Sequence, residues 1–129
     1  MKQLFVFAVI YIMIAGCISK QDKYVGAWFG KTGAKDTIMI VFDPDGYAAI
    51  MKNSEVLGGK NKEGVNSTKY VFDWSKEPVW LDFIEFTDNK ETYRNKLVVR
   101  FISKDKMLLA PRLKQAPDFE DGTILTRIK

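Results

Sequence analysis

From Lys23 onward, turn-forming residues divide the sequence into short runs about every ten positions. The runs are rich in β-branched and aromatic residues, and none keeps a helical period over the roughly 11 residues that would indicate a helix. This pattern predicts an all-β domain with little helix. The expected strands are 24–30, 37–42, 47–52, 68–74, 79–86, 96–103, 107–113 and 123–128.

Polar turns are expected between successive strands. Asp43-Pro44-Asp45-Gly46 has Pro where a type I turn fixes φ and Gly where φ is positive, so it predicts a hairpin between the second and third strands. Segments 87–91 and 103–106 are further turns, and 53–66 is a solvated connection that could act as a lid at a barrel mouth. Eight sequential strands lose their exposed edges by closing into an up-and-down barrel, whose interior is filled or holds one small ligand.

The composition argues against several classes of function. The 129 residues contain one cysteine and no histidine, so neither an internal disulfide nor a zinc site of the usual His/Cys type is available. The 20 Lys and Arg residues only slightly outnumber the 16 Asp and Glu residues, and they form no block of like charge. This balance argues against nucleic acid as a partner.

The N-terminus has the order of a secretory signal: a lysine at position 2, an apolar run over 4–14, then Ala15-Gly16-Cys17. The run is shorter than the about 20 residues that a membrane span needs. The polar segment that follows, Ser19-Lys20-Gln21-Asp22-Lys23, reads as a tether.

Ile14-Ala15-Gly16-Cys17 resembles the bacterial lipobox. The resemblance implies that the chain is cut before Cys17, which then carries lipid on its sulfur and its amine. It divides the chain into a signal peptide (1–16), a lipidated tether (17–23) and a folded domain (24–129). The alternative is a buried free cysteine in an ordinary secreted or anchored protein.

The same resemblance implies a location in the cell envelope. In a Gram-negative cell, Ile18 rather than Asp after the cysteine favours the outer membrane, and in a Gram-positive cell the anchor lies on the outer face of the plasma membrane. Removing residues 1–16 takes away one lysine and leaves 19 cations against 16 anions. An excess of this size permits only weak attraction to acidic head groups.

The domain resembles small lipocalin-like domains of bacterial lipoproteins. Gly26-Ala27-Trp28 is similar to the Gly-x-Trp signature of lipocalins, and Arg127 lies in the last strand, where that superfamily places a basic residue across the Trp ring. A guanidinium over indole is worth about 0.5–2 kcal/mol, so the pair would help to close the barrel. The similar layout also includes Asp45-Gly46, Pro78 before Leu81-Asp82, Ala116-Pro117-Asp118-Phe119 and Leu125-Thr126-Arg127.

The aromatic residues are candidates for either core or pocket. Tyr70, Phe72 and Trp74 share one face of their strand, so they are expected to point inward. Some could line an apolar pocket, with Tyr70 or Arg100 as a polar contact, although the sequence leaves the facing of Arg100 open. Trp80 follows a turn and could be exposed near the barrel rim.

Candidate catalytic groups are few. Without histidine a nucleophile would need Lys, Asp, Glu or Tyr as its base, and no Gly-x-Ser-x-Gly elbow or phosphate-binding Gly-Lys-Ser/Thr loop occurs. Asp82 and Glu85 lie on opposite faces of a regular strand, so pairing with Arg94, Arg100 or Arg112 is expected instead of acid–base chemistry. The carboxylates of Asp43, Asp45 and Asp88 could supply oxygen ligands to a metal ion, but we expect these residues to serve as turn residues instead. We therefore expect no enzyme activity, no metal and no cofactor.

The leading interpretation is a membrane-anchored envelope lipoprotein that binds a small apolar or amphipathic ligand without catalysis. The alternative is a barrel with a solid core whose surface binds an envelope protein, as an inhibitor or scaffold would.

Overall fold

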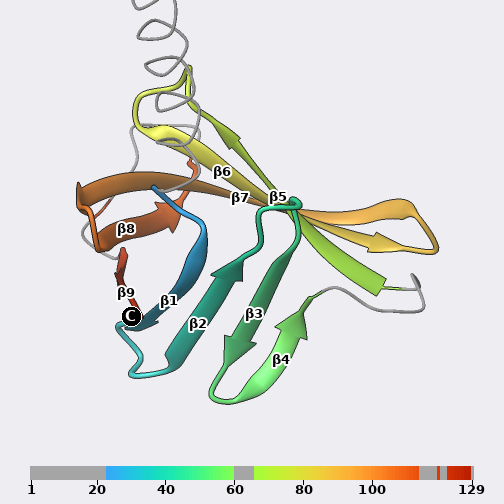
Figure 1. The fold of residues 1–129 in the computed structure, drawn as a ribbon, viewed down its shortest axis with the longest axis horizontal. Coiled ribbons are helices and arrows are strands. Elements are labelled where there is room, and N and C mark those ends of the chain that lie inside the picture. The colour runs from blue at the N-terminus through green and yellow to red at the C-terminus, as the bar shows by residue number, and fades with distance from the viewer. Residues whose placement is uncertain (1–22, 60–65, 114–118, 120–121, 129) are drawn as a thin grey trace, which may run out of the picture.

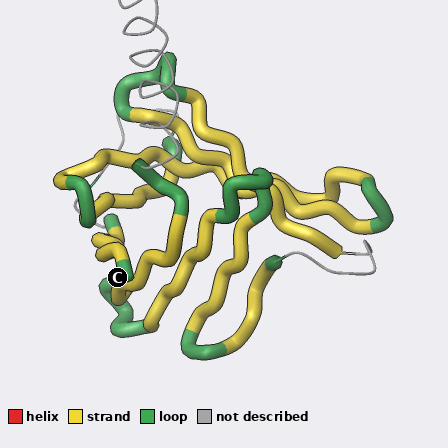
Figure 2. Tube along the Cα trace, viewed as in Figure 1, coloured by secondary structure: helices red, strands yellow, loops and turns green. Residues whose placement is uncertain are grey.

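The computed structural model describes residues 23–59, 66–113, 119 and 122–128. These residues form nine antiparallel strands and no helix (Figures 1 and 2). Nothing in this part of the chain has the length and hydropathy of a membrane-spanning helix. The strands are β1 Gly26–Lys31, β2 Thr37–Phe42, β3 Ala48–Lys52, β4 Glu55–Gly58, β5 Asn66–Asp73, β6 Val79–Thr87, β7 Lys90–Ser103, β8 Lys106–Pro111 and β9 Thr123–Arg127.

The strands form one sheet that curls into a nearly closed barrel. Their order is β4-β3-β2-β1-β9-β8-β7-β6-β5, so strands that follow one another in the chain pair with each other, except β4 and β5, and the last strand pairs with the first. The β1–β9 pairing joins residues about 100 positions apart, with Trp28 opposite Arg127. The expected all-β, antiparallel class is confirmed.

The sheet has its two ends at β4 and β5. This seam is bridged at three points: the Thr68 amide donates to the Gly59 carbonyl at 2.8 Å, the Tyr70 amide donates to the Gly46 carbonyl at 3.1 Å, and Tyr47 forms an isolated bridge with Lys69. These few backbone contacts take the place of the full ladder of hydrogen bonds that would close the barrel.

The count of nine strands corrects the expected eight, because β4 lies in the segment 53–66 that was expected to be a loop. Asn53 and Ser54 both have positive φ, which forms a tight two-residue turn of the kind that joins hairpin strands. The turn reverses the chain at once and pairs Met51 with Val56. The sequence signal is weak because neither turn residue is glycine.

The second correction concerns β7, which begins at Lys90 and not at Lys96. Its first seven residues are all exposed, so they carry no alternation of apolar and polar side chains. The turn before it is correspondingly shorter than expected, with Asp88 and Asn89 at positive φ. This end of the β6–β7 hairpin projects from the barrel at the right of Figure 1.

The hairpin expected at Asp43-Pro44-Asp45-Gly46 is confirmed. Gly46 has φ of 93°, its amide donates to the Asp43 carbonyl at 3.2 Å, and β2 pairs with β3 on either side. The Asp45 carboxylate accepts from the Tyr47 amide, so it belongs to the turn.

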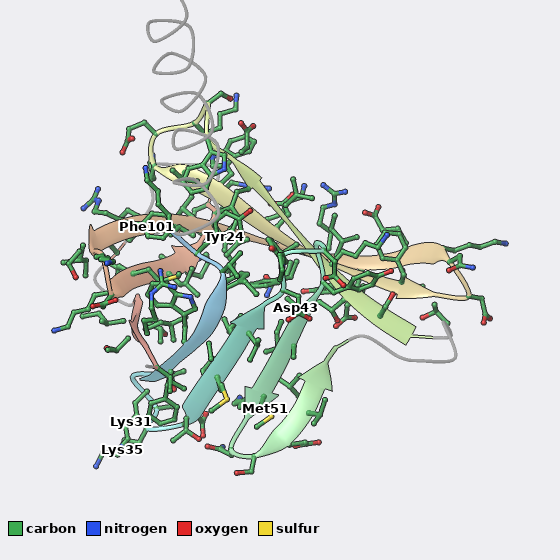
Figure 3. The ribbon with its side chains drawn as sticks, in the orientation of Figure 1. Tyr24, Lys31, Lys35, Asp43, Met51 and Phe101 are labelled. Atoms are coloured by element: carbon green, nitrogen blue, oxygen red, sulfur yellow. The ribbon has the colours of Figure 1, made fainter. Side chains whose placement is uncertain are left out.

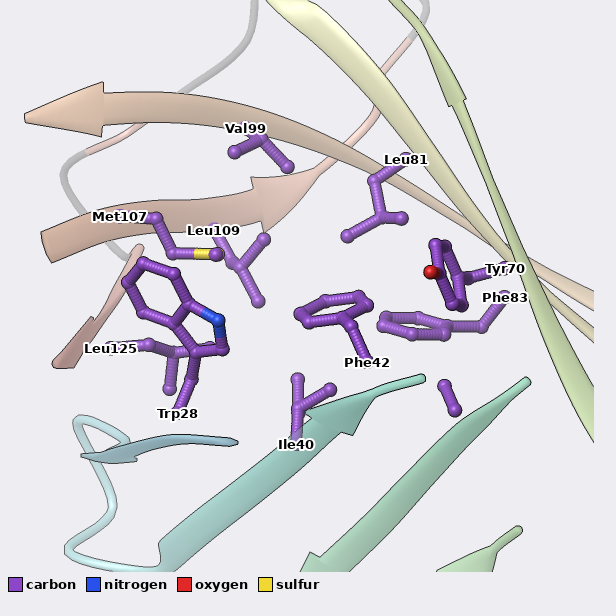
Figure 4. Packing of buried hydrophobic residues seen from close by; sticks show 11 residues of the cluster. Trp28, Ile40, Phe42, Tyr70, Leu81, Phe83, Val99, Met107, Leu109 and Leu125 are labelled. Atoms are coloured by element: carbon purple, nitrogen blue, oxygen red, sulfur yellow. The ribbon is translucent and has the colours of Figure 1, made fainter. Parts of the chain in front are cut away.

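One hydrophobic core fills the centre of the barrel (Figure 4). Every strand except β4 contributes a buried member to it: Trp28, Ile40, Phe42, Ala48, Tyr70, Leu81, Phe83, Val99, Met107, Leu109 and Leu125. Trp28, Leu81, Met107 and Leu125 have no exposed surface. Since the chain lacks a disulfide, the burial of these side chains is the main source of stability in this barrel.

Candidate functional site

Aromatic rings gather at the end of the barrel where β1 begins. Phe72 lies with its ring centroid 4.6 Å from that of Tyr24 and 5.1 Å from that of Trp74. Phe101 stacks on Trp74 at 5.8 Å, and Tyr24 and Phe101 can be located in Figure 3. Tyr70, Phe72 and Trp74 thus share the inner face as expected. Tyr70 belongs to the core, Phe72 packs against it, and Trp74 stacks on Phe72.

Tyr70 supplies a buried polar group at this end. Its side chain is 8% exposed, and its hydroxyl donates to the Asp43 carbonyl at 2.5 Å. Burial, with the neighbouring Tyr24 and the carboxylates of Asp43 and Asp45, raises the pKa of the Tyr70 phenol far above its ordinary value. The phenol therefore stays protonated and acts as a hydrogen-bond donor to the turn.

The opposite end of the barrel, where β1 ends and β2 begins, holds an open apolar cavity of about 350 Å³. We call it the mouth cavity. Its walls come from β2, β3, β4, β6, β7, β8 and β9: Ile38, Ile40, Ile50, Leu57, Phe83, Leu97, Leu109, Ala110 and Leu125. Thr32, Asn95, Pro111 and Thr123 complete the lining. Every side chain in this lining is uncharged, so the cavity suits an apolar group with an uncharged polar end.

A smaller hollow of about 240 Å³ lies at the seam between β4 and β5. Leu57 lines both this hollow and the mouth cavity, and Glu85 lines the hollow alone. The side chain of Leu57 is 51% exposed. The seam hollow therefore adjoins the mouth cavity at the half-exposed side chain of Leu57.

Trp28 and Arg127 meet at the junction of the first and last strands. The guanidinium carbon of Arg127 lies 4.4 Å from the centroid of the Trp28 ring. Arg127 Nη1 donates to the Val25 carbonyl at 2.7 Å, and Nη2 donates to the Lys23 carbonyl at 2.9 Å. Trp28 Nε1 donates to the Tyr24 carbonyl at 2.8 Å. The two side chains thus hold the segment before β1 against the end of β9.

Gly26 lies beneath this clamp. It has φ of 125°, a backbone conformation that residues other than glycine rarely adopt. A Cβ there would lie 3.4 Å from Arg127 Nη1. Asp105 completes the surroundings, with Oδ1 3.5 Å from Arg127 Nε. The structure therefore brings Gly26, Trp28 and Arg127 together.

Trp80 and Arg100 lie outside the barrel, away from the other predicted ligand-binding residues. The Arg112 guanidinium carbon lies 4.0 Å from the Trp80 ring centroid, and Arg100 lies 4.4 Å from the Phe119 ring. The alternation of β7 did not decide the facing of Arg100, because Val98 and Val99 are both apolar and both buried. The structure thus separates the predicted set into an inner and an outer group.

Asp82 and Glu85 do not converge. Asp82 faces outward and forms ion pairs with Arg94 at 3.0 Å and Arg112 at 2.8 Å, as the sequence predicted for one of these two acids. Glu85 lies at the seam hollow on the other side of β6. The pairing shifts register after Glu85, yet the two carboxylates line different hollows.

The sequence interpretation of a ligand-binding barrel implied a cavity at one end, but it did not identify the residues that line the mouth cavity. β2 reads Thr-Ile-Met-Ile-Val-Phe, which is apolar on both faces, so alternation could not tell Ile38 and Ile40 from Met39 and Val41. The turn predicted at Asp43-Pro44-Asp45-Gly46 could have identified the inward face, because the register of its hairpin places Ile40 opposite Ile50 on one face of the sheet.

Cys17, the predicted signal peptide and the predicted tether up to residue 22 lie outside the described residues. Residues 116–118 of the lipocalin-like layout also lie outside them. Comparisons of this chain with protein-family models, with curated proteins and with solved structures found no match.

Proposed function

We propose that this chain is an envelope lipoprotein, anchored in a membrane through lipid on Cys17, whose lipocalin-like barrel binds a small apolar or amphipathic ligand without catalysis. The observation that carries the binding role is the mouth cavity. Ligand pockets typically have volumes of about 300–1,000 Å³, apolar walls and a few polar groups. The cavity, at about 350 Å³, lies at the small end of that range.

The polar groups of the cavity favour a particular kind of ligand. Thr32, Asn95 and Thr123 offer hydroxyl and amide groups, which donate and accept hydrogen bonds but carry no charge. Most of the wall side chains are the branched aliphatic groups of Ile and Leu, which complement an acyl or similar hydrocarbon group. We infer a ligand with an apolar body and an uncharged polar end.

Filling the cavity tests this proposal. Ile50→Trp places a large ring in the cavity and is expected to weaken binding of an uncharged fluorescent naphthylamine by at least about tenfold, or about 1.4 kcal/mol. The measurement is the rise in probe fluorescence during titration with protein. The melting temperature of the variant shows whether the barrel is retained.

Met51→Trp is the matched control, because Met51 is the next residue on β3 and faces outward. It should bind the probe as the unchanged protein does. Equal loss of binding in both variants, or no binding of the probe by the unchanged protein, would contradict a ligand site in the mouth.

Cys17→Ser tests the anchor. The variant is expected to lose incorporation of a labelled fatty acid and to leave the membrane fraction as a folded domain with an unchanged melting temperature. The reason is that Cys17 precedes the first barrel strand in the sequence, and two or three acyl chains are what make attachment stable. Loss of folding in this variant would contradict an anchor role.

A second function, surface binding of an envelope protein, is favoured by a row of apolar side chains outside β1–β4. Phe29, Met39, Met51 and Val56 are neighbours across these strands, and Phe29 and Val56 are 39% and 69% exposed. If this row is the working surface, Met51→Trp alters protein complexes recovered by cross-linking in membranes, and Ile50→Trp leaves them unchanged.

A further inference from the structure

The outer face of β5–β8 gathers much of the positive charge of the domain. We call it the cationic face. Inward-facing residues of these strands, such as Leu81, Val99 and Leu109, belong to the core, so alternation turns their neighbours outward. The charged residues of the face are Lys69, Arg94, Lys96, Arg100 and Arg112, against Asp73, Asp82 and Glu91, which pairs with Arg94 at 2.8 Å.

A groove of about 550 Å³ runs across this face. Trp80 lines it and is 36% exposed, which leaves part of the indole open to solvent. Arg112 stacks over the ring at 4.0 Å, and the ammonium of Lys76 lies 4.8 Å from the ring centroid. A Trp ring flanked by cations is suited to the boundary between water and a lipid head-group layer.

Asp82 organises the charges of the groove. It binds Arg94 and Arg112 at once, and both Asp82 and Arg112 have side chains only 13% exposed. These ion pairs hold the two guanidinium groups in place beside Trp80. Lys96, which lines the same groove, and Arg100 are exposed and remain to attract anions.

The cationic face lies beside the point from which the tether leaves the barrel. The ammonium of Lys23, the first described residue, lies 5.8 Å from the ring centroid of Trp74. Trp74 lies in the same β5–β6 turn as Lys76, which contacts Trp80. Between Cys17 and Lys23 the chain can reach at most about 20 Å, so an anchor at Cys17 would keep this face close to the bilayer.

We propose that the cationic face docks onto anionic phospholipid head groups of the membrane that holds the anchor, with Trp80 at the head-group level. The position of the membrane in this proposal rests on the proposed acylation of Cys17, and the charge complementarity does not. Docking orients the barrel, because the anchored end and the β5–β8 side then meet the bilayer. The mouth cavity lies at the opposite end from the tether.

The test uses the full acylated chain in vesicles of phosphatidylcholine, with and without phosphatidylglycerol. Head-group spin-labelled lipid is the quencher of Trp fluorescence, and Trp80→Phe identifies the signal of Trp80. We expect quenching at least about threefold stronger in the anionic vesicles. Near 1 M salt, where the Debye length falls to about 3 Å, the quenching in anionic vesicles should fall to its value in neutral vesicles.

Lys96→Gln combined with Arg100→Gln should reduce the quenching to its value in neutral vesicles. Lys31→Gln combined with Lys35→Gln is the control, since it removes the same charge near the mouth end, where Figure 3 labels both lysines. Control and test variants that lose quenching equally would overturn the proposal, as would equal quenching in both vesicle types.

A failed anchor gives a different result from a failed docking face. A chain without acyl groups does not sediment with neutral vesicles. It still sediments with anionic vesicles at low salt, and this binding depends on Lys96 and Arg100. An acylated chain that sediments with both vesicle types and shows no quenching at Trp80 overturns docking and leaves the anchor in place.

Discussion

Arg127→Ala is expected to lower the free energy of unfolding by about 3 kcal/mol, since hydrogen bonds to a charged group are each worth about 1.5–3 kcal/mol and the stack on the indole adds about 0.5–2 kcal/mol. The change removes the bonds to the carbonyls of Val25 and Lys23 and uncovers the ring of Trp28. It also removes the ion pair between Arg127 and the partly buried carboxylate of Asp105. Urea unfolding followed by Trp fluorescence measures the loss.

Arg100→Ala is the matched control. Its guanidinium lies 4.4 Å from the Phe119 ring, the same distance that separates Arg127 from Trp28, but Arg100 is exposed. It should cost less than about 1 kcal/mol, as exposed cation–π contacts do. Arg127→Lys should recover only part of the stability, because the ammonium of lysine cannot reproduce the planar guanidinium group that donates to two carbonyls and stacks on the indole. Equal costs for the two alanine variants would contradict the closing role of Arg127.

A disulfide across the seam is expected to stabilise the barrel by about 3 kcal/mol, the entropic value for a loop of about ten residues. A Cβ at Gly58 would lie 3.2 Å from the Thr68 Cβ and 2.3 Å from its hydroxyl. Gly58→Cys with Thr68→Cys replaces that hydroxyl with sulfur, and a shift of a few tenths of an ångström reaches the Cβ separation of about 3.5–4.5 Å that a disulfide needs. The measurement is the difference in melting temperature between oxidised and reduced protein.

The engineered disulfide is best made in a chain that also carries Cys17→Ser. Cys17 is the one cysteine of the sequence, so the two new thiols can then pair only with each other. Each single cysteine variant serves as a control and should be insensitive to reductant. If the double variant stays reduced under oxidant, β4 and β5 do not meet at Gly58 and Thr68 as described.

Strand pattern and turn chemistry predicted most of the barrel from the sequence. Gly46 provides a positive φ that few other residues accept, so the β2–β3 hairpin was predictable from four residues. The turn at Asn53 and Ser54 uses the same backbone region with residues that enter it less readily, and the strand that follows was missed. Turns that depend on tertiary contacts leave little trace in local sequence.

The candidate sites were harder to predict, because facing in this barrel depends on register more than on alternation. Val98 and Val99 are both buried, on opposite faces of β7, so the sequence could not place Arg100. The pairing of Asp82 with two arginines needs β6, β7 and the end of β8 to lie side by side. Each strand was predictable alone, and the sites arise only where several of them meet.

The place of β9 between β1 and β8 has a consequence for the time course of folding. The bond from Arg127 to the Val25 carbonyl spans 102 positions, and Leu125 completes the core beside Trp28. The barrel therefore cannot close until the last strand is available, and contacts of such long sequence separation make folding slow. During synthesis, the barrel stays open until the residues of β9 have been made.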